Sequence, residues 1–213
     1  MVFSVPAIYP ILDSSFIPTQ KRAEFLGRLG AELAGAGVRL LEYRNKTGSE
    51  DEILADAAIL RLAMPAEKIK LILDDRAELV ERCGFDGVHV DAGDVSAAEA
   101  RRLLGPERIV GTFGGSTEFL QGVLEGPADY LAIGPVFTTT TKQTSTAAIG
   151  VEGVRRMRGL AGSGRILTAA GGVTLDSAGA ILEAGANAVA VSAAIFGMSD
   201  PAAEFRRWMQ ALE

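Results

Sequence analysis

The sequence has little of what disulfide-rich, membrane and nucleic-acid-binding proteins need. Its one cysteine, Cys83, cannot form an internal disulfide, and we expect a buried structural thiol in a reducing compartment. No apolar run approaches the about 18 residues that span a bilayer, and no basic segment followed by an apolar one marks the N-terminus. The 21 Lys and Arg residues, against 27 Asp and Glu residues, form no basic stripe. We therefore expect a cytoplasmic protein with no membrane and no nucleic-acid partner.

What the chain does contain fits one globular unit. Of its 213 residues, 48% are hydrophobic, which is enough for one sizeable core. The 25 glycines are spread along the chain, as in a fold with many tight turns, and no linker interrupts it. We therefore expect residues 1–213 to form a single domain.

Short apolar runs recur along the chain and predict eight strands. The runs are continuous rather than alternating, which is typical of parallel strands buried on both faces. The predicted strands are Ile8 to Leu12, Val38 to Tyr43, Ile69 to Leu73, Gly87 to Val90, Arg108 to Thr112, Tyr130 to Ile133, Arg165 to Ala169 and Ala188 to Val191.

The segments between these strands carry apolar residues at helical spacing, which predicts eight helices. They are Thr19 to Ala34, Ser49 to Ala63, Asp75 to Arg82, Ser96 to Leu104, Ser116 to Glu125, Val151 to Gly159, Thr174 to Ala184 and Pro201 to Leu212. The last helix carries an apolar stripe that we expect to lie in the core or in an interface: Phe205, Trp208, Met209 and Leu212. Self-association as a homo-oligomer therefore stays open.

Strands that alternate with helices over short connections predict a single-domain (β/α)8 TIM barrel. An open, doubly wound sheet is the alternative. In a barrel, ligands and catalytic groups lie just after the strands, at their carboxyl ends. Polar residues do follow the strands: Arg44 and Lys46, Asp74 and Asp75, Asp91 and Asp94, the threonines before Lys142, Gly171 and Gly172, and Ser192.

Two of these groups suit a polyanion and a metal ion. Arg44 and Lys46 alternate at strand spacing, so both side chains can leave on one side and clamp a polyanion, with Asn45 opposite. They could equally pair with helix carboxylates at an exposed strand end. Asp75 and Asp94 end neighbouring strands and suit Mg²⁺ when phosphate oxygens complete its shell, although Asp75 could instead cap the helix that follows.

A second anion site is predicted after strands six to eight. The stretch from Gly134 to Lys142, GPVFTTTTK, offers hydroxyls, backbone N–H groups and a cation, although a polar surface loop would have the same composition. Gly171-Gly172 and Val191-Ser192 fit the phosphate cup of many barrels. We expect His89, inside the fourth strand, to be a packed core histidine rather than a base or a ligand.

The sequence resembles the thiamine-phosphate synthases, also called thiamine-phosphate pyrophosphorylases, and the related thiazole tautomerases. The resemblance covers most of the chain, and the piece that ends at Lys142 is its most specific part. The matching pieces are YPILDSS from Tyr9, EYRNK from Glu42, LILDDR from Leu71, GFDGVHVDAGD from Gly84, ADYLAIGPVFTTTTK from Ala128, AAGGV from Ala169 and GANAVAVSAAI from Gly185.

The resemblance implies an enzyme that joins hydroxymethylpyrimidine diphosphate to hydroxyethylthiazole phosphate, with diphosphate leaving first. It assigns the diphosphate to Arg44, Lys46 and Lys142, and its Mg²⁺ to Asp75 and Asp94. It assigns the thiazole phosphate to a second set: Thr139, Thr141, Gly171, Gly172, Val191 and Ser192. These substrates are the partners it implies, with Glu42 and Asp74 among the substrate-binding positions.

Four departures from the family pattern leave other functions open. Glu42 stands where glutamine is usual, and Asp74 where asparagine is usual, so both add negative charge beside an anion site. The stretch from Gly111 to Gly115 replaces a G-x-S-x-H piece, and Asp91-Ala92-Gly93 replaces Gly-Gln-Glu. A tautomerase-like paralogue, which needs neither Lys142 nor the aspartate pair, and a non-catalytic binder of phosphorylated ligands are the alternatives.

Overall fold

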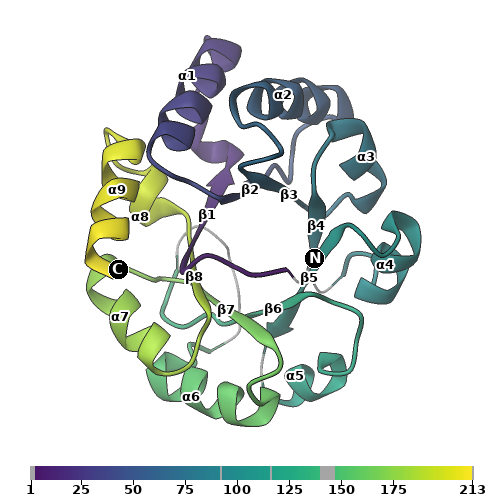
Figure 1. The fold of residues 1–213 in the computed structure, drawn as a ribbon, viewed down its shortest axis with the longest axis vertical. Coiled ribbons are helices and arrows are strands. Elements are labelled where there is room, and N and C mark those ends of the chain that lie inside the picture. The colour runs from purple at the N-terminus through teal and green to yellow at the C-terminus, as the bar shows by residue number, and fades with distance from the viewer. Residues whose placement is uncertain (1–2, 92, 116, 140–146, 213) are drawn as a thin grey trace.

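The computed structural model is a closed barrel of parallel strands in the order β1 to β8, with helices around the outside (Figure 1). The structure describes residues 3–91, 93–115, 117–139 and 147–212. The strands are β1 Ile8–Asp13, β2 Leu40–Arg44, β3 Lys70–Asp74, β4 Gly87–Val90, β5 Ile109–Gly115, β6 Tyr130–Ile133, β7 Ile166–Ala170 and β8 Ala188–Val191. The TIM barrel is confirmed, and the open sheet is excluded because β1 pairs with β8.

The helices lie between the strands and cover the outer face of the barrel (Figure 1). The α-helices are α1 Arg22–Gly35, α2 Glu50–Ala63, α3 Val80–Cys83, α4 Ala97–Leu104, α5 Thr117–Val123, α6 Gly150–Ala161, α7 Leu175–Glu183, α8 Ala193–Phe196 and α9 Pro201–Leu212. The 3-10 helices within the described residues are η1 Ser14–Phe16 and η2 Ala77–Leu79.

Alternate side chains of each strand enter two different cores, because successive residues of a strand point to opposite faces. In β3, Leu71 and Leu73 belong to the core beneath the helices, whereas Ile72 belongs to the core inside the barrel. The inner core comprises Tyr9, Leu40, Ile72, Ile109, Tyr130, Ala188 and Ala190. We call the inward-pointing positions of a strand its inner phase. At the carboxyl ends of the strands, residues in the inner phase therefore face the opening at that end of the barrel.

Gly111 of β5 makes room for the ring of Tyr130 inside the barrel. A Cβ built on Gly111 of β5 would lie 2.1 Å from Cζ of Tyr130, so the tyrosine ring fits only because its neighbour is glycine. Gly111 and Tyr130 are also Cα partners between β5 and β6. At the amino ends of the strands, the N-terminal segment before β1 crosses the barrel (Figure 1). There the ring centroids of Phe3 and Tyr130 lie 5.9 Å apart.

The predicted start of the third helix is wrong, and the short helix α8, Ala193–Phe196, was not predicted. The helix predicted from Asp75 begins instead at Ala77, as η2, and continues as α3. Asp75 and Arg76 have φ of 56° and 46°, so both adopt the left-handed conformation that a helix cannot contain. Asp75 is therefore not a helix cap. This tight turn leaves its carboxylate beside the end of β3.

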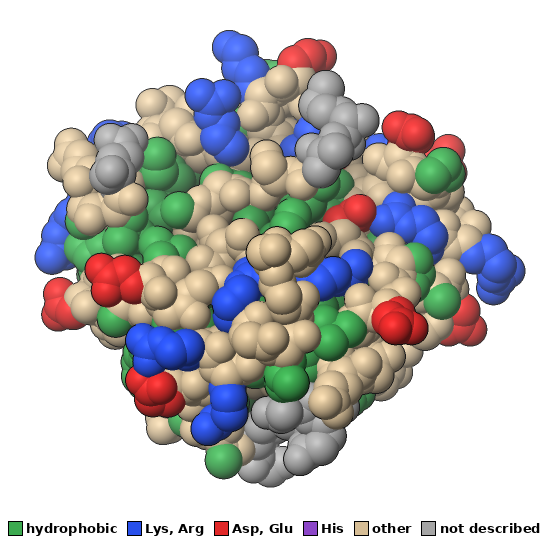
Figure 2. All heavy atoms as spheres, turned by 60° about the horizontal axis from the view of Figure 1, so that its bottom comes forward, with side chains coloured by type: hydrophobic (Ala, Val, Ile, Leu, Met, Phe, Trp, Pro, Cys, Tyr) green, Lys and Arg blue, Asp and Glu red, His purple; other side chains and the backbone are tan. Residues whose placement is uncertain are grey.

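Other parts of the chain lie where the sequence indicated. Cys83 is buried, and burial raises the pKa of its thiol to about 11. Phe205 and Trp208 of α9 are buried in the core, and Met209 and Leu212 pack against it. None of the helices in the described part of the chain has the length and apolar character needed to cross a membrane. On the face drawn in Figure 2, Lys and Arg side chains are interspersed with Asp and Glu side chains.

Candidate active site

A cavity of about 580 Å³ lies at the carboxyl ends of the strands. Its walls come from residues in the inner phase of all eight strands and from the loops that follow them, as the barrel predicts. Its lining is mainly apolar, with polar groups contributed by the early strands and by the strands and loops from β6 to β8. Those from the early strands and β7 are Glu42, Arg44, Asp74, His89, Asp91 and Thr168.

Arg44 and Lys46 leave the end of β2 on the same side, as their spacing predicts. Arg44 Nε lies 3.4 Å from Asp74 Oδ2, and Lys46 Nζ lies 3.2 Å from the same oxygen. Asn45 points the other way, where its side-chain amide donates to Glu52 Oε1 of α2 at 2.8 Å. The two cations therefore pair with aspartates at strand ends rather than with helix carboxylates.

Asp13 is a site residue that the sequence analysis missed. Its carboxylate pairs with Arg44, and Oδ1 accepts hydrogen bonds from the Ser15 backbone N–H at 2.9 Å and the Ser15 hydroxyl at 2.6 Å. Burial opposes ionisation, but the bonds from Ser15 and Arg44 outweigh it and lower the pKa of Asp13. Asp13 therefore holds the Arg44 guanidinium from the β1 side.

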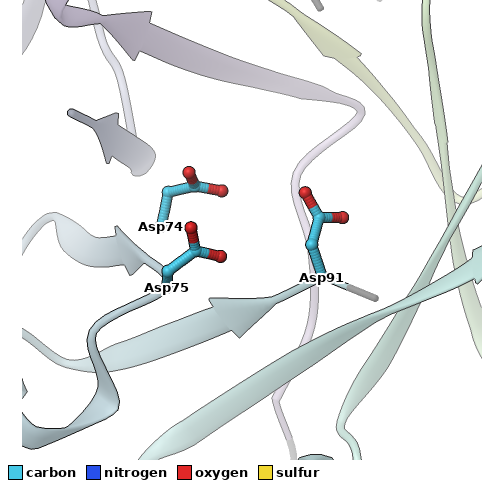
Figure 3. A group of neighbouring side chains, drawn as sticks. All are labelled: Asp74, Asp75 and Asp91. Carbon is cyan, nitrogen blue, oxygen red and sulfur yellow. The ribbon is translucent and has the colours of Figure 1, made fainter. Parts of the chain in front are cut away.

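Three carboxylates meet beside these cations. Oxygens of Asp74, Asp75 and Asp91 lie within 4.8 Å of one another. Figure 3 shows Asp74 and Asp75 side by side at the end of β3, with Asp91 across from them after β4. Asp94, which the resemblance assigned to the metal, is outside this group, and its Oδ2 accepts the Asp91 backbone N–H at 3.0 Å.

The crowding of carboxylates is reflected in their acidity. Burial, followed by the charge of Asp75, raises the pKa of Asp74 to about 6. Burial and the neighbouring carboxyl of Asp94 raise the pKa of Asp75 to about 6, so Asp94 lies close enough to act on it. Asp75 Oδ1 is buried with no hydrogen-bond partner within the described residues, and Asp74 Oδ2 is buried beside the two cations described above. Buried carboxylate oxygens with unused lone pairs are a fitting environment for a hard cation.

A hydrogen-bonded chain crosses the barrel interior below this cluster. The Tyr9 hydroxyl donates to Glu42 Oε2 at 2.7 Å, and the hydroxyls of Tyr9 and Tyr130 lie 2.8 Å apart. His89 Nδ1 lies 3.2 Å from the Tyr130 hydroxyl, and the two rings stack with centroids 5.6 Å apart. Burial, offset in part by the charge of His89, raises the pKa of Glu42 to about 7.

His89 is buried, as expected, but it is not an ordinary core residue, because it lines the cavity. Its Nε2 lies 3.8 Å from Asp91 Oδ1. Burial alone would lower the pKa of His89, but the neighbouring Asp91 and the charge of Glu42 raise it. His89 lies beside Asp74 in the strand register, since the two residues are Cα partners on β4 and β3, and both side chains face the cavity.

The opposite wall of the cavity is built from the loop after β6 and the glycine turn after β7. Backbone N–H groups of Val136 and Phe137 donate to Ala170 O at 2.8 Å and to Gly171 O at 2.9 Å, which ties the two segments together. Gly171 and Gly172 have φ of 91° and 65°, and a Cβ on Gly172 would lie 2.5 Å from Thr138 O. Only glycine allows this approach.

The residues predicted for a phosphate lie partly on this wall. Thr139, Gly171, Gly172, Val191 and Ser192 all line the cavity. The hydroxyls of Thr168 and Ser192 are buried with no hydrogen-bond partner within the described residues. Thr168 was missed by the sequence analysis, although it shares the inner strand phase. Thr141 and Lys142 lie outside the described residues.

Known proteins resemble this chain over nearly its whole length. Residues 8–195 match the family described as thiamine monophosphate synthase. A thiamine-phosphate synthase of Koribacter versatilis is 38% identical over 208 residues, which cover 98% of this chain and 96% of that protein. A thiamine-phosphate synthase from Agrobacterium fabrum is 33% identical over 191 residues, which cover 88% of this chain and 87% of that protein.

Solved structures share the fold. A thiamine phosphate pyrophosphorylase from Pyrococcus furiosus superposes with a TM-score of 0.81 at 23% identity, covering 97% of this chain and 95% of that chain. An orotidine 5'-phosphate decarboxylase from Pyrococcus horikoshii gives a TM-score of 0.67 at 13% identity, covering 96% and 99%. Since proteins of such different activity share this barrel, the fold alone does not carry the function. The sequence matches decide the family, and the chain belongs to the thiamine monophosphate synthase family.

Proposed function

We propose that the protein is a Mg²⁺-dependent thiamine-phosphate synthase, which joins hydroxymethylpyrimidine diphosphate to hydroxyethylthiazole phosphate and releases diphosphate. The observation that carries the proposal is the pairing of cations with clustered carboxylates at one side of the cavity. A leaving diphosphate and its metal ion need both kinds of group together. Membership of the family supports the same assignment.

Arg44 and Lys46 are proposed to hold the diphosphate, with Lys142 completing the set from the loop after β6. Charge-assisted hydrogen bonds to phosphate oxygens contribute about 1.5–3 kcal/mol each, more than an exposed ion pair. Asp13 positions Arg44 for this contact through the pair described above. The thiazole phosphate is assigned to the other wall of the cavity, at the turn of Gly171 and Gly172.

The reaction requires one bond to break and one to form. The bond between the pyrimidine methylene carbon and the diphosphate oxygen breaks first, and its electron pair leaves with the diphosphate. The lone pair of the thiazole nitrogen then forms the new carbon–nitrogen bond, so no proton has to move. The protein lowers the barrier by stabilising negative charge where it develops on the leaving group, which is the work assigned to Arg44 and Lys46.

The metal ion fits the donor set. Asp74, Asp75 and Asp91 offer carboxylate oxygens, the ligands that Mg²⁺ prefers, and Asp75 Oδ1 is buried without a hydrogen-bond partner within the described residues. Bound there, Mg²⁺ would neutralise charge on the diphosphate. Asp75 and Asp94 remain the pair that the family resemblance favours, and Asp94 contacts the same loop.

The proposal is tested with purified protein, both substrates and Mg²⁺. We expect thiamine phosphate and diphosphate to appear in equal amounts, measured by chromatography and by an assay for released diphosphate. No product over a wide range of substrate concentration would contradict the proposal. A tautomerase-like activity and simple binding of phosphorylated ligands have less support, because neither requires the cation and carboxylate groups together.

A further inference from the structure

Lys46 lies at the centre of the three-carboxylate cluster. Its Nζ forms an ion pair with Asp75, lies 3.2 Å from Asp74 Oδ2 and lies 3.9 Å from Asp91 Oδ2. Oxygens of the same three carboxylates lie within 4.8 Å of one another. The ammonium of Lys46 therefore stands close to the point where one metal ion would contact all three side chains.

The ammonium neutralises this cluster incompletely. Asp75 Oδ1 is buried with no hydrogen-bond partner among the described residues, and Asp74 Oδ2 has the ion-pair contacts of Lys46 and Arg44 at 3.2 and 3.4 Å. The side chains of Asp74 and Asp75 are only 3% and 11% exposed, so water supplies little compensation. An ammonium carries one charge and three donors, whereas a divalent cation carries two charges and can take six oxygen ligands.

Lys46 has a way to leave the cluster. It is the least buried member, with a side chain 34% exposed, and its four-carbon stem is flexible. It lines a second cavity, of about 510 Å³, whose walls come mainly from the loops after β1 and β2. A second cation placed between the carboxylates would repel the ammonium at close range.

We propose that Lys46 and a divalent cation are alternative occupants of the pocket formed by Asp74, Asp75 and Asp91, and that Lys46 moves onto a bound oxyanion when the cation enters. The oxyanion step rests on the proposed function, because it takes the diphosphate as the group that receives Lys46. The competition between the two cations does not depend on it. Cation binding and diphosphate binding are then coupled, since each favours the position of Lys46 that the other requires.

The competition is tested by Mn²⁺ binding to the substrate-free protein, with free Mn²⁺ measured by electron paramagnetic resonance. Because Lys46→Met removes the internal cation but keeps the apolar stem, we expect at least about tenfold tighter binding than in the unmodified protein. Lys70→Met is the matched control. Lys70 Nζ also pairs with an aspartate, Asp86, at 2.9 Å, but at the amino end of β3. Its Mn²⁺ affinity should stay unchanged.

A second variant identifies the pocket. Adding Asp91→Asn to Lys46→Met removes one ligand and should cancel most of the gain. Lys46→Gln provides a further test if the methionine variant folds poorly, as judged by the fluorescence of Trp208, the single tryptophan. Equal or weaker Mn²⁺ binding in the folded Lys46 variants would overturn the inference. This readout needs no substrate, so a failure of the synthase assay would be seen separately.

Discussion

Glu42 is the position where a single substitution tests the energetics of the site most cleanly. The residue is 3% exposed and lines the cavity, and its carboxyl accepts a hydrogen bond from Tyr9. Glu42→Gln keeps the size and the acceptor oxygen while it removes the charge. We expect the variant to be more stable than the unmodified protein at pH 8 and equally stable near pH 4.5.

The magnitude follows from the acidity of the folded protein. Burial raises the pKa of Glu42 from 4.5 to about 7, and one pKa unit corresponds to about 1.4 kcal/mol. Well below pH 4.5 the carboxyl is protonated in both the folded and the unfolded state, so it does not change the free energy of unfolding. Between pH 4.5 and 7 the folded state binds more protons than the unfolded state, so stability falls as pH rises. Above pH 7 the full penalty of about 3 kcal/mol remains, and Glu42→Gln removes it.

The assay is urea unfolding at several pH values, followed by the fluorescence of Trp208, which is buried in the core. Titrations of groups that Glu42 does not influence cancel in the difference between the unfolding free energies of the two proteins. His89 is an exception, because the charge of Glu42 helps to raise its pKa and the substitution removes that charge. Glu67→Gln, a change at an exposed residue, is the control and should give no such trend. A stability difference between Glu42→Gln and the unmodified protein that does not grow from pH 4.5 to pH 8 would refute the reasoning.

Two further substitutions test the barrel interior and the loop after β6. Gly111→Ala places a Cβ 2.1 Å from the Tyr130 ring and should cost at least about 2 kcal/mol in thermal unfolding, whereas Gly179→Ala, with no atom within 4 Å, should not destabilise. Equal effects would contradict the packing argument. Lys142→Ala should lower kcat/KM at least about tenfold through a lost phosphate contact, while Lys68→Ala at the amino end of β3 should leave it unchanged. A comparable loss in both would remove Lys142 from the site.

The strand pattern was enough to predict the barrel and the end of it that holds the site. Continuous apolar runs with charged residues after them led directly to Arg44, Lys46, Asp74 and Asp75. This works because a closed parallel barrel brings the carboxyl ends of its strands to one rim. The helix boundary at Asp75 could not be predicted, since nothing in the residue types requires two successive left-handed residues at Asp75 and Arg76.

Several polar residues inside the barrel could not be predicted in the same way. Tyr9, Tyr130 and Thr168 lie inside strands and appear in the sequence as ordinary members of buried runs. Their direction depends on strand phase and register, which tertiary pairing fixes rather than local sequence. Likewise, the meeting of Lys46 with three carboxylates depends on side-chain directions across β2, β3 and β4, which spacing along one strand cannot supply.

The most direct test of the central claim is a coupled assay with both substrates, in which Mg²⁺ is removed by EDTA and then restored. The account predicts formation of thiamine phosphate with Mg²⁺, loss of that activity in EDTA, and recovery when Mg²⁺ is added in excess. Product formation that is unchanged in EDTA would contradict the metal assignment, and no product under any condition would contradict the synthase itself.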